Sequence, residues 1–289
     1  MFNHFYYVLS LFLFVIPGIA SAVTARDIMQ DYIDRDDGKS QYSTSVIATC
    51  RYTSKNGKIK CAEKPRIKKL EGAQKDYGNN GKDSRSISIV LKPVAENGIG
   101  FLQFDYDATD RDSDQWMYLS ALGKVKRLVS GNDDEPKSGT LFGSEISYED
   151  IEKTHIDDYE YKIVKEESYQ GRDSWVIESL PKPKRARKSN YSKSVSWIDK
   201  KTRLLLQAQV YDRAGKPIKH IVASQHELVD NIWISKQLNI NNLQSRRITT
   251  MKTQTVIINP SINDELFTQR TLTDGAYRTR QLINLRQGL

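Results

Sequence analysis

The sequence predicts a mainly β protein with a few short helices, whose antiparallel sheet curls into a half-open barrel. Runs rich in β-branched and aromatic residues follow one another from residue 41 to residue 259. Gly, Asn and Asp turn signals separate these runs at short intervals. Helical periodicity is confined to short stretches. We expect about ten to twelve strands, with the helices packed inside or across one mouth of the barrel and closing its concave side.

The first 22 residues predict a cleaved secretory signal peptide. They contain no Lys, Arg, Asp or Glu, residues 6–19 are almost wholly apolar, and Ala20-Ser21-Ala22 supplies the small residues of a cleavage site. The apolar run is shorter than the ~20 residues that a membrane-spanning helix needs, so an uncleaved anchor is the less favoured alternative. Residues 23–289 are expected to form a single domain in the periplasm.

The exported part of the chain is basic. The formal net charge is +8, and none of it lies in the predicted signal peptide. Nucleic acid is not expected as a partner outside the cytoplasm. An anionic membrane surface, met transiently, or an acidic partner explains the charge better, and solubility alone is the alternative.

The first elements are a helix and a cysteine hairpin. Residues 24–34 predict an amphipathic helix that Thr24 can cap. Strands over 41–53 and 58–69 carry Cys50 and Cys61, which an oxidising compartment would join in a disulfide that stabilises by about 3 kcal/mol in the chain-entropy model. A two-residue Asn56-Gly57 turn would place Tyr52 opposite Cys61, so we expect a four-residue loop, 54–57, if the disulfide forms. Residues 71–82 are polar and predict a loose excursion.

The next strands differ in how many of their faces are apolar. Residues 84–93 alternate, with Ile87, Ile89 and Leu91 on one face and Ser86, Ser88 and Val90 on the other. The strand 99–106 is apolar on both faces, which is typical of a strand that is buried on both sides or lines a cavity.

Residues 115–152 form the most informative run. Two strands, 115–119 and 124–129, precede a polar loop at 130–138 and a return of apolar residues at 140–144. Ser147-Tyr148-Glu149-Asp150 then forms the outline of a capping box for a short helix. We expect residues 141–151 to fold back across the mouth of the barrel, and we expect no catalytic role for the two acidic residues.

The rest of the chain predicts hairpins over 159–181, 194–212 and 216–241. A last long strand over 246–259 and a short helix over 262–267 follow them. Residues 181–188 interrupt them with two prolines, which discourage regular structure, and with five cations. They form either a solvated connection or an electrostatic contact with acidic headgroups or a membrane partner. The candidates for that contact are Lys182, Lys184, Arg185, Arg187 and Lys188.

Catalytic motifs are missing from the sequence. His155, His220 and His226 are not at the spacing of zinc ligands, and HExxH, G-x-S-x-G and Walker A patterns do not occur. We therefore expect no enzyme, cofactor or metal, and a hydrolase is the least favoured alternative. A curled sheet can instead shelter a hydrophobic ligand. The candidate cavity residues are Phe101, Phe104, Trp116, Tyr118, Leu141 and Phe142.

The central run resembles a signature of the outer membrane lipoprotein-sorting (LolA-like) family. Its elements are Trp116-x-Tyr118-Leu119, Lys124-x-Lys126-Arg127-Leu128 and the run from Phe142 to Asp150. The resemblance implies a half-open antiparallel barrel, similar to LolA and LolB, with a helical lid over an apolar cavity. It also implies a monomeric periplasmic carrier for a lipid or an acylated lipoprotein, in a branch associated with inner-membrane RND or MMPL-type exporters. The alternative is a non-carrier module that docks on such an exporter through the basic segment.

Overall fold

The computed structural model describes residues 23–287 except residues 57, 79 and 130–134. The predicted signal peptide, residues 1–22, and the first part of the predicted polar loop, residues 130–134, lie outside this range. Within the described range, no helix is both long and apolar enough to cross a bilayer.

One antiparallel sheet of fourteen strands dominates the structure. Its order is β7-β6-β5-β4-β3-β1-β14-β13-β12-β11-β10-β9-β8, and β2 pairs with β1 off this path. The strands are β1 (Ser40–Lys55), β2 (Lys58–Cys61), β3 (Arg66–Tyr77), β4 (Asp83–Lys92), β5 (Gly100–Asp105), β6 (Asp114–Leu119), β7 (Lys124–Leu128), β8 (Tyr159–Tyr169), β9 (Arg172–Pro181), β10 (Tyr191–Asp199), β11 (Leu205–Asp212), β12 (Pro217–Val229), β13 (Ile232–Asn242) and β14 (Arg247–Ile258). The edge strands β7 and β8 are not paired with each other, so the curled sheet is open.

The helices are short and lie outside the sheet order. They are α1 (Ala25–Ile33), α2 (Pro183–Lys188), α3 (Gln269–Thr273) and α4 (Gly275–Gln287), with 3-10 turns η1 (Val94–Glu96), η2 (Leu141–Gly143), η3 (Glu149–Ile151), η4 (Ile156–Asp158) and η5 (Asp264–Leu266). The half-open, mainly β architecture was predicted correctly. The expected strand count was too low, partly because residues 62–65 divide the predicted strand 58–69 into β2 and β3.

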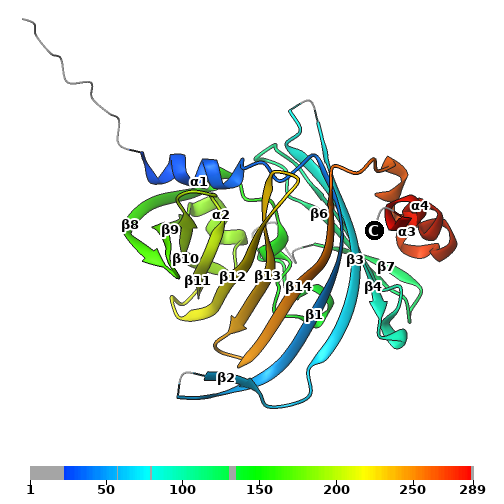
Figure 1. Cartoon of the computed structure of the whole chain (residues 1–289), viewed down its shortest axis with the longest axis horizontal. Helices are drawn as coiled ribbons and strands as arrows, with labels where there is room; N and C mark the ends of the chain where they lie inside the picture. The colour runs from blue at the N-terminus through cyan, green and yellow to red at the C-terminus, as the bar shows by residue number, and fades with distance from the viewer. Residues whose placement is uncertain (1–22, 57, 79, 130–134, 288–289) are drawn as a thin grey trace, which may run out of the picture.

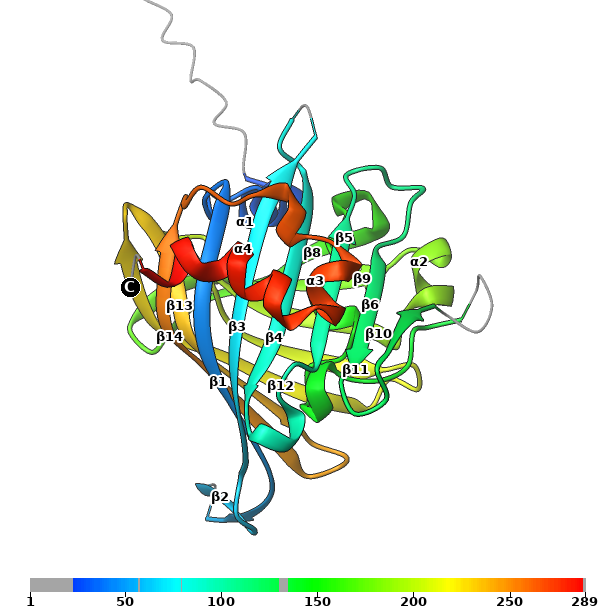
Figure 2. The same ribbon diagram turned by 90° about the vertical axis from the view of Figure 1, so that its right-hand side faces the viewer.

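The helices cover different faces of the sheet. Figure 1 shows α1 across β8 and β9, while α3 and α4 lie on the far side of the β1–β3–β4 region. In Figure 2, α4 crosses the outer face of β1, β3 and β4. The inner, concave face therefore belongs to α1 and to the lid segment (residues 139–154), and the outer face belongs to the C-terminal helices.

The outer face of the first half of the sheet holds the largest apolar cluster. Ile87, Ile89 and Leu102 of β4 and β5 pack there against Leu272 and Leu282 of α3 and α4. At Gly100 a Cβ atom would lie 2.8 Å from the Leu272 side chain, so glycine permits α3 to approach β5. Apolar burial thus fixes the C-terminal helices on the outer face.

A buried ion pair also holds α4 to the sheet. Glu71 of β3 is 2% exposed and accepts hydrogen bonds from Arg286 Nε (2.7 Å) and Nη2 (2.6 Å). The Tyr42 hydroxyl donates to the same carboxylate at 2.7 Å. The predicted loose excursion over 71–82 was therefore wrong in its first part. Residues up to Tyr77 continue β3, and they are polar because one face binds α4 and the other lines a cavity.

Helix α1 forms as predicted and packs on the inner face. Thr24 Oγ1 accepts a hydrogen bond from the Asp27 N–H at 3.2 Å, and the Asp27 carboxylate accepts from the Thr24 N–H at 3.1 Å, which completes a capping box. Ile28 and Met29 pack against Ile177 of β9 and Ile198 of β10. The stripe of apolar residues therefore packs on a protein core.

The lid segment closes the other part of the concavity. Its side chains Leu141, Phe142, Ile146 and Tyr148 pack against inner-face residues such as Phe101. A Cβ atom at Gly139 would lie 2.7 Å from the Tyr148 ring, so only glycine allows this tight return. The predicted fold-back across the mouth occurs, but with the 3-10 turns η2 and η3 in place of the expected helix.

The disulfide joins Cys50 and Cys61, with Cα atoms 5.7 Å apart. The expected four-residue loop is wrong, because Lys55 pairs directly with Lys58 and Tyr52 lies opposite Cys61. The two cysteines are diagonal neighbours. Strand β2 ends at Cys61, and the Ala62 N–H donates to the Arg51 carbonyl at 2.8 Å. This hydrogen bond continues the pairing with β1 by one residue beyond β2.

Candidate ligand-binding site

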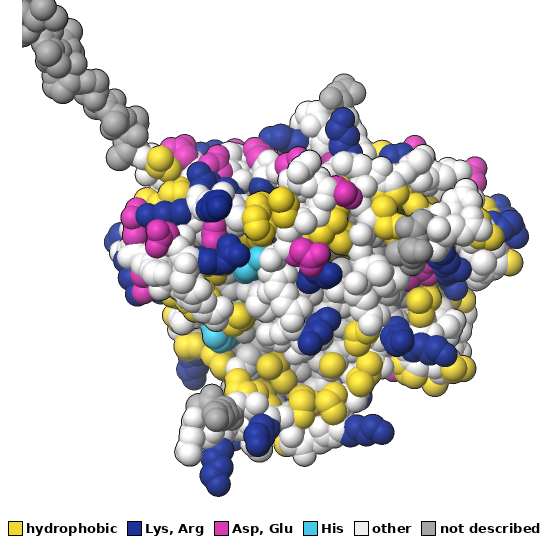
Figure 3. Space-filling view, in the orientation of Figure 1, with side chains coloured by type: hydrophobic (Ala, Val, Ile, Leu, Met, Phe, Trp, Pro, Cys, Tyr) yellow, Lys and Arg dark blue, Asp and Glu magenta, His cyan; other side chains and the backbone are white. Residues whose placement is uncertain are grey.

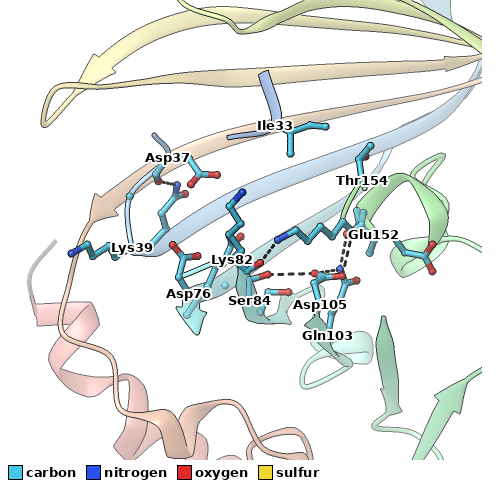
Figure 4. Close-up of a pocket in the computed structure, with 18 of the residues that line it drawn as sticks. Ile33, Asp37, Lys39, Asp76, Lys82, Ser84, Gln103, Asp105, Glu152 and Thr154 are labelled. Atoms are coloured by element: carbon cyan, nitrogen blue, oxygen red, sulfur yellow. Dashed lines mark hydrogen bonds between the residues drawn. The ribbon is translucent and has the colours of Figure 1, made fainter. Parts of the chain in front are cut away.

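The concave face encloses a cavity of about 890 Å³. Its walls are the inner faces of β1, β3, β4 and β5, the segment that follows α1, and the lid segment. Figure 4 shows labelled side chains from β3, β4, β5, the segment that follows α1 and the lid segment around one space. The volume lies within the range of small-molecule pockets, roughly 300–1,000 Å³.

One wall of the cavity is polar. Ser84, Ser86 and Ser88 alternate along β4 and line it, because Ile87 and Ile89 take the outer face beneath the C-terminal helices. Other polar residues on this wall are Gln41, Ser43, Gln74 and Gln103. The cavity is therefore less apolar than the family resemblance implies, and its wall offers hydroxyl and amide groups.

One part of the cavity beside the lid is apolar, although the lid residues Glu152, Lys153 and Thr154 also line the cavity. Phe101 of β5, Leu141 and Ile151 of the lid, and Met251 of β14 line it. Phe101 also stacks on Tyr148, with ring centroids 5.9 Å apart. A ligand in this cavity would meet hydrocarbon on one side and hydrogen-bonding groups on the other.

Charged groups surround the rim. Lys82 pairs with Asp34 at 3.4 Å, and Lys153 pairs with Asp107 at 3.7 Å. Asp37 and Asp76 form no ion pair with any described residue. Burial raises the pKa of Asp76 to about 6, the Asp37 carboxylate adds to the rise, and Lys153 opposes it. Burial also raises the pKa of Asp37, so these two carboxyl groups resist simultaneous ionisation.

Two buried glutamines hold the lid from the sheet side. Gln103 Nε2 donates to the Ile151 carbonyl at 2.6 Å, and Gln115 Nε2 donates to the Tyr148 carbonyl at 3.2 Å. Gln115 Nε2 also donates to Gln103 Oε1 at 2.9 Å. These side chains satisfy backbone carbonyls that the irregular lid leaves without secondary-structure partners. Their one signal in the sequence is a glutamine within each of two mostly apolar strands.

Two carboxylates, the buried Glu149 and the half-buried Asp150, hold the lid from the opposite side. Glu149 accepts hydrogen bonds from Arg185 Nη2 and the Asn190 N–H, each at 2.7 Å. Asp150 accepts from the Ser147 N–H at 2.7 Å and from the Tyr191 hydroxyl at 2.7 Å, and it pairs with Lys219. The Asp150 N–H donates to Ser147 Oγ at 3.2 Å, so the predicted capping box is present. Both acidic residues additionally join the lid to α2, β10 and β12.

A smaller cavity of about 250 Å³ lies on this second side of the lid. Its lining includes Tyr159 and Tyr161 of β8, Tyr191 of β10 and Val210 of β11. The Tyr161 hydroxyl is buried there without a hydrogen-bond partner among the described residues.

The predicted cavity residues divide between the two faces of the sheet. Phe101 and Leu141 line the larger cavity, and Phe142 packs in the adjoining inner cluster. Phe104, Trp116 and Tyr118 pack in the outer cluster beneath α3 and α4. The alternation along β5 and β6 sends these three side chains away from the cavity, and we leave them out of the candidate site.

The predicted basic contact segment forms α2 instead of an irregular connection, with Pro183 in its first turn, where a proline N–H is not needed. Arg185 is largely buried and pairs with Glu149 at 2.7 Å and with Glu152 at 3.5 Å. Lys188 pairs with Asp112 at 2.6 Å. Lys182 is half-buried, whereas Lys184 and Arg187 are exposed. Part of the positive charge of this segment, that of Arg185, is therefore bound to acidic residues of the lid.

An open, curled antiparallel sheet with a lidded cavity on its concave face defines this chain as a protein of the half-open β-barrel class. A family model described as an uncharacterized protein matches residues 82–274. No curated protein sequence matches the chain significantly.

Solved structures of similar proteins agree with this class. A DUF1329 family protein from Desulfovibrio piger is 26% identical, with a TM-score of 0.75 over 86% of this chain and 97% of that chain. An outer membrane lipoprotein-sorting protein domain from Vibrio parahaemolyticus is 25% identical, with a TM-score of 0.73 over 86% and 98% of the two chains. A LolA superfamily protein from Nitrosomonas europaea shares the fold at 18% identity, with a TM-score of 0.61 over 86% and 98%. The chain therefore belongs to the family whose model matches residues 82–274, and it shares the fold of the LolA superfamily protein.

Proposed function

We propose that this protein is a periplasmic carrier that binds the acyl chain of a lipid or lipoprotein in the larger cavity and carries it between envelope membranes or to an exporter. The observation that carries the proposal is the two-sided lining of the cavity, apolar beside the lid and polar along β4. The names of the similar proteins, a lipoprotein-sorting domain and a LolA superfamily protein, point to the same class of cargo.

The apolar side suits an acyl chain. Each methylene group removed from water contributes about 0.8 kcal/mol, so hydrocarbon packed against Phe101, Leu141 and Met251 needs no covalent attachment to be retained. Because the lid contributes Leu141 and Ile151 to this side, movement of the lid would change the affinity for the chain.

The polar side suits the ester, amide or headgroup that accompanies an acyl chain. The hydroxyl groups of Ser84, Ser86 and Ser88 can both donate and accept hydrogen bonds. An amphipathic ligand would therefore satisfy both walls, whereas a pure hydrocarbon would leave the polar wall without partners. We infer that the cargo is amphipathic.

Cavity filling tests the proposal. Ser86→Trp places a bulky side chain on the polar wall without altering the outer apolar cluster. We expect lipid in organic extracts of the native protein, and at least tenfold weaker binding of a fluorescent fatty acid by the variant, because the indole occupies ligand volume. Mass spectrometry of the extracts and fluorescence titration measure these effects.

Ser168→Trp is the matched control, because Ser168 is exposed on the edge strand β8. It should bind the fatty acid as the native protein does, and both variants should keep the native circular dichroism spectrum. Absence of lipid from the native extract together with absence of fatty-acid binding would refute the carrier function.

A further inference from the structure

The basic charge of the chain is concentrated at one end of the sheet. The segment 51–69 comprises the end of β1, β2 and the start of β3, and we call it the hairpin end. Its only acidic residue in the sequence is Glu63. Its cations are Arg51, Lys55, Lys58, Lys60, Lys64, Arg66, Lys68 and Lys69. The excess of eight cations over one anion in this segment nearly equals the formal net charge of the whole chain, which is +8.

Most of these cations are not neutralised by the fold. Lys68 pairs with Glu96, and no ion pair with another described residue is formed by Arg51, Lys55, Lys60, Lys64, Arg66 or Lys69. Glu63 accepts a hydrogen bond from the Arg51 N–H at 3.0 Å. Lys55, Lys60, Lys64 and Arg66 are exposed. This contrasts with α2, where Arg185 and Lys188 are bound to acidic partners.

Large aliphatic side chains are exposed between these cations. Ile59 is 42% exposed and Ile67 is 55% exposed. The adjacent turns add Val94 of η1 and Leu243, which precedes β14. Figure 3 shows hydrophobic side chains beside lysine and arginine over the lower end of the molecule, where Figure 1 places β2.

These segments form one continuous end. The ion pair between Lys68 and Glu96 joins β3 to η1, and the Tyr52 N–H donates to the Arg246 carbonyl at 2.9 Å, which joins the hairpin to the turn before β14. The disulfide between Cys50 and Cys61 closes the base of the hairpin. The hairpin projects beyond the neighbouring strands in Figures 1 and 2, so a flat surface can meet it.

We propose that the hairpin end docks on an anionic bilayer surface, with Ile59 and Ile67 entering the headgroup layer and the surrounding cations binding lipid phosphates. Each Lys or Arg near an anionic surface strengthens binding about fivefold, and apolar side chains add affinity that salt does not screen. An acidic protein would match the charge, but it would not by itself explain aliphatic side chains that are exposed between the cations. This docking does not depend on the nature of the cargo.

Vesicle binding tests the proposal. The mature chain is mixed with vesicles rich in phosphatidylglycerol or with vesicles of phosphatidylcholine alone, and the bound fraction is measured by sedimentation. We expect binding to the anionic vesicles that weakens as salt increases. The triple variant Lys60→Gln, Lys64→Gln, Arg66→Gln should bind about 100-fold more weakly, from about 1 kcal/mol for each cation. The double variant Ile59→Ser, Ile67→Ser should bind the anionic vesicles at least tenfold more weakly than the native chain does.

The control variant Lys162→Gln, Lys201→Gln, Arg280→Gln removes three exposed cations elsewhere and should bind as the native chain does. Ser86→Trp should also bind normally, which separates docking from cargo binding. The proposal is overturned if native protein does not bind anionic vesicles, if both triple variants weaken binding equally, or if the isoleucine pair binds unchanged. Failure of native binding would leave an acidic protein partner as the explanation for the charge.

Discussion

The Asp37–Asp76 pair shows how a cavity rim can change the ionisation of ordinary side chains. Asp76 lies on β3 and Asp37 on the link between α1 and β1, so the fold brings together two carboxyl groups that are far apart in the sequence. Burial is the main cause of the raised pKa of Asp76, which is about 6, and repulsion by Asp37 comes second. Folded protein therefore holds the Asp76 proton more tightly than unfolded chain does.

Replacing Asp76 by Asn is expected to stabilise the protein near neutral pH. The native pKa of about 6 exceeds the ordinary value of 3.8, so the free energy of unfolding falls as pH rises through this window. Asp76→Asn removes this loss of stability. Because Asp76 is half-exposed, we expect the free energy of unfolding to increase by about 1 kcal/mol at about pH 7.5 and to change little at about pH 4. Urea unfolding at both pH values measures it.

Asp110→Asn, at an exposed position, is the control. Its free energy of unfolding should differ from that of the native protein by the same amount at both pH values. An Asp76→Asn gain that is equally large at low pH would contradict the linkage, because the cause would then not be ionisation.

At the scale of elements, the lid segment depends on side chains that anchor it from both sides. It has little regular structure, and polar contacts hold it in place from Gln103 and Gln115 on one side and through Glu149 and Asp150 on the other. The sequence suggested a cap at Ser147, and the cap is present. Local pattern could not reveal that the same acidic residues bind Arg185 and Tyr191, because these partners belong to elements further along the chain.

Glu149→Ala is expected to loosen the lid. The change leaves Arg185, which is largely buried, and Ser189, which is 2% exposed, without the carboxylate that they contact at 2.7 and 2.5 Å. Removing one partner of a buried ion pair costs about 3–5 kcal/mol. Hydrogen exchange should rise over residues 139–154, and the melting temperature should fall.

Glu160→Ala, at an exposed position in β8, is the matched control and should leave both measurements unchanged. Native exchange rates across the lid in the Glu149 variant would show that the ion pair does not hold this segment.

At the scale of the whole molecule, the C-terminal helices decide which face of the sheet is concave. Residues 268–287 carry weak helical periodicity, and the last element that we predicted was the short helix over 262–267, yet α3 and α4 cover the apolar face of β4 and β5. Once they occupy that face, the serines of β4 must face the cavity. The polar character of the candidate site is therefore a consequence of packing on the opposite side of the sheet.

Removal of residues 261–289 is expected to abolish stable folding. It exposes Ile87, Leu102 and the neighbouring apolar side chains, and it removes Arg286, the ion-pair partner of Glu71. A patch of this kind is an aggregation site in a soluble protein. The truncated chain should bind a hydrophobic dye strongly and sediment as aggregates, whereas a monomeric and cooperatively folded truncation would show that the helices are dispensable.

The sequence by itself determined those features that depend on near neighbours. The Thr24–Asp27 capping box, the hairpin strands, the alternation of Ile87 with Ser88 and the cysteine pair all follow from local spacing. The tertiary structure decided the sidedness of each strand, and with it which residues reach the cavity. Side chains alternate along a strand with a period of two, and this pattern is the same whichever face of the sheet is inward. Only contacts between distant segments, such as Ile89 with Leu272, decide which face is inward. For this reason Trp116 and Tyr118 lie under the C-terminal helices while Ser84 and Ser86 line the candidate site.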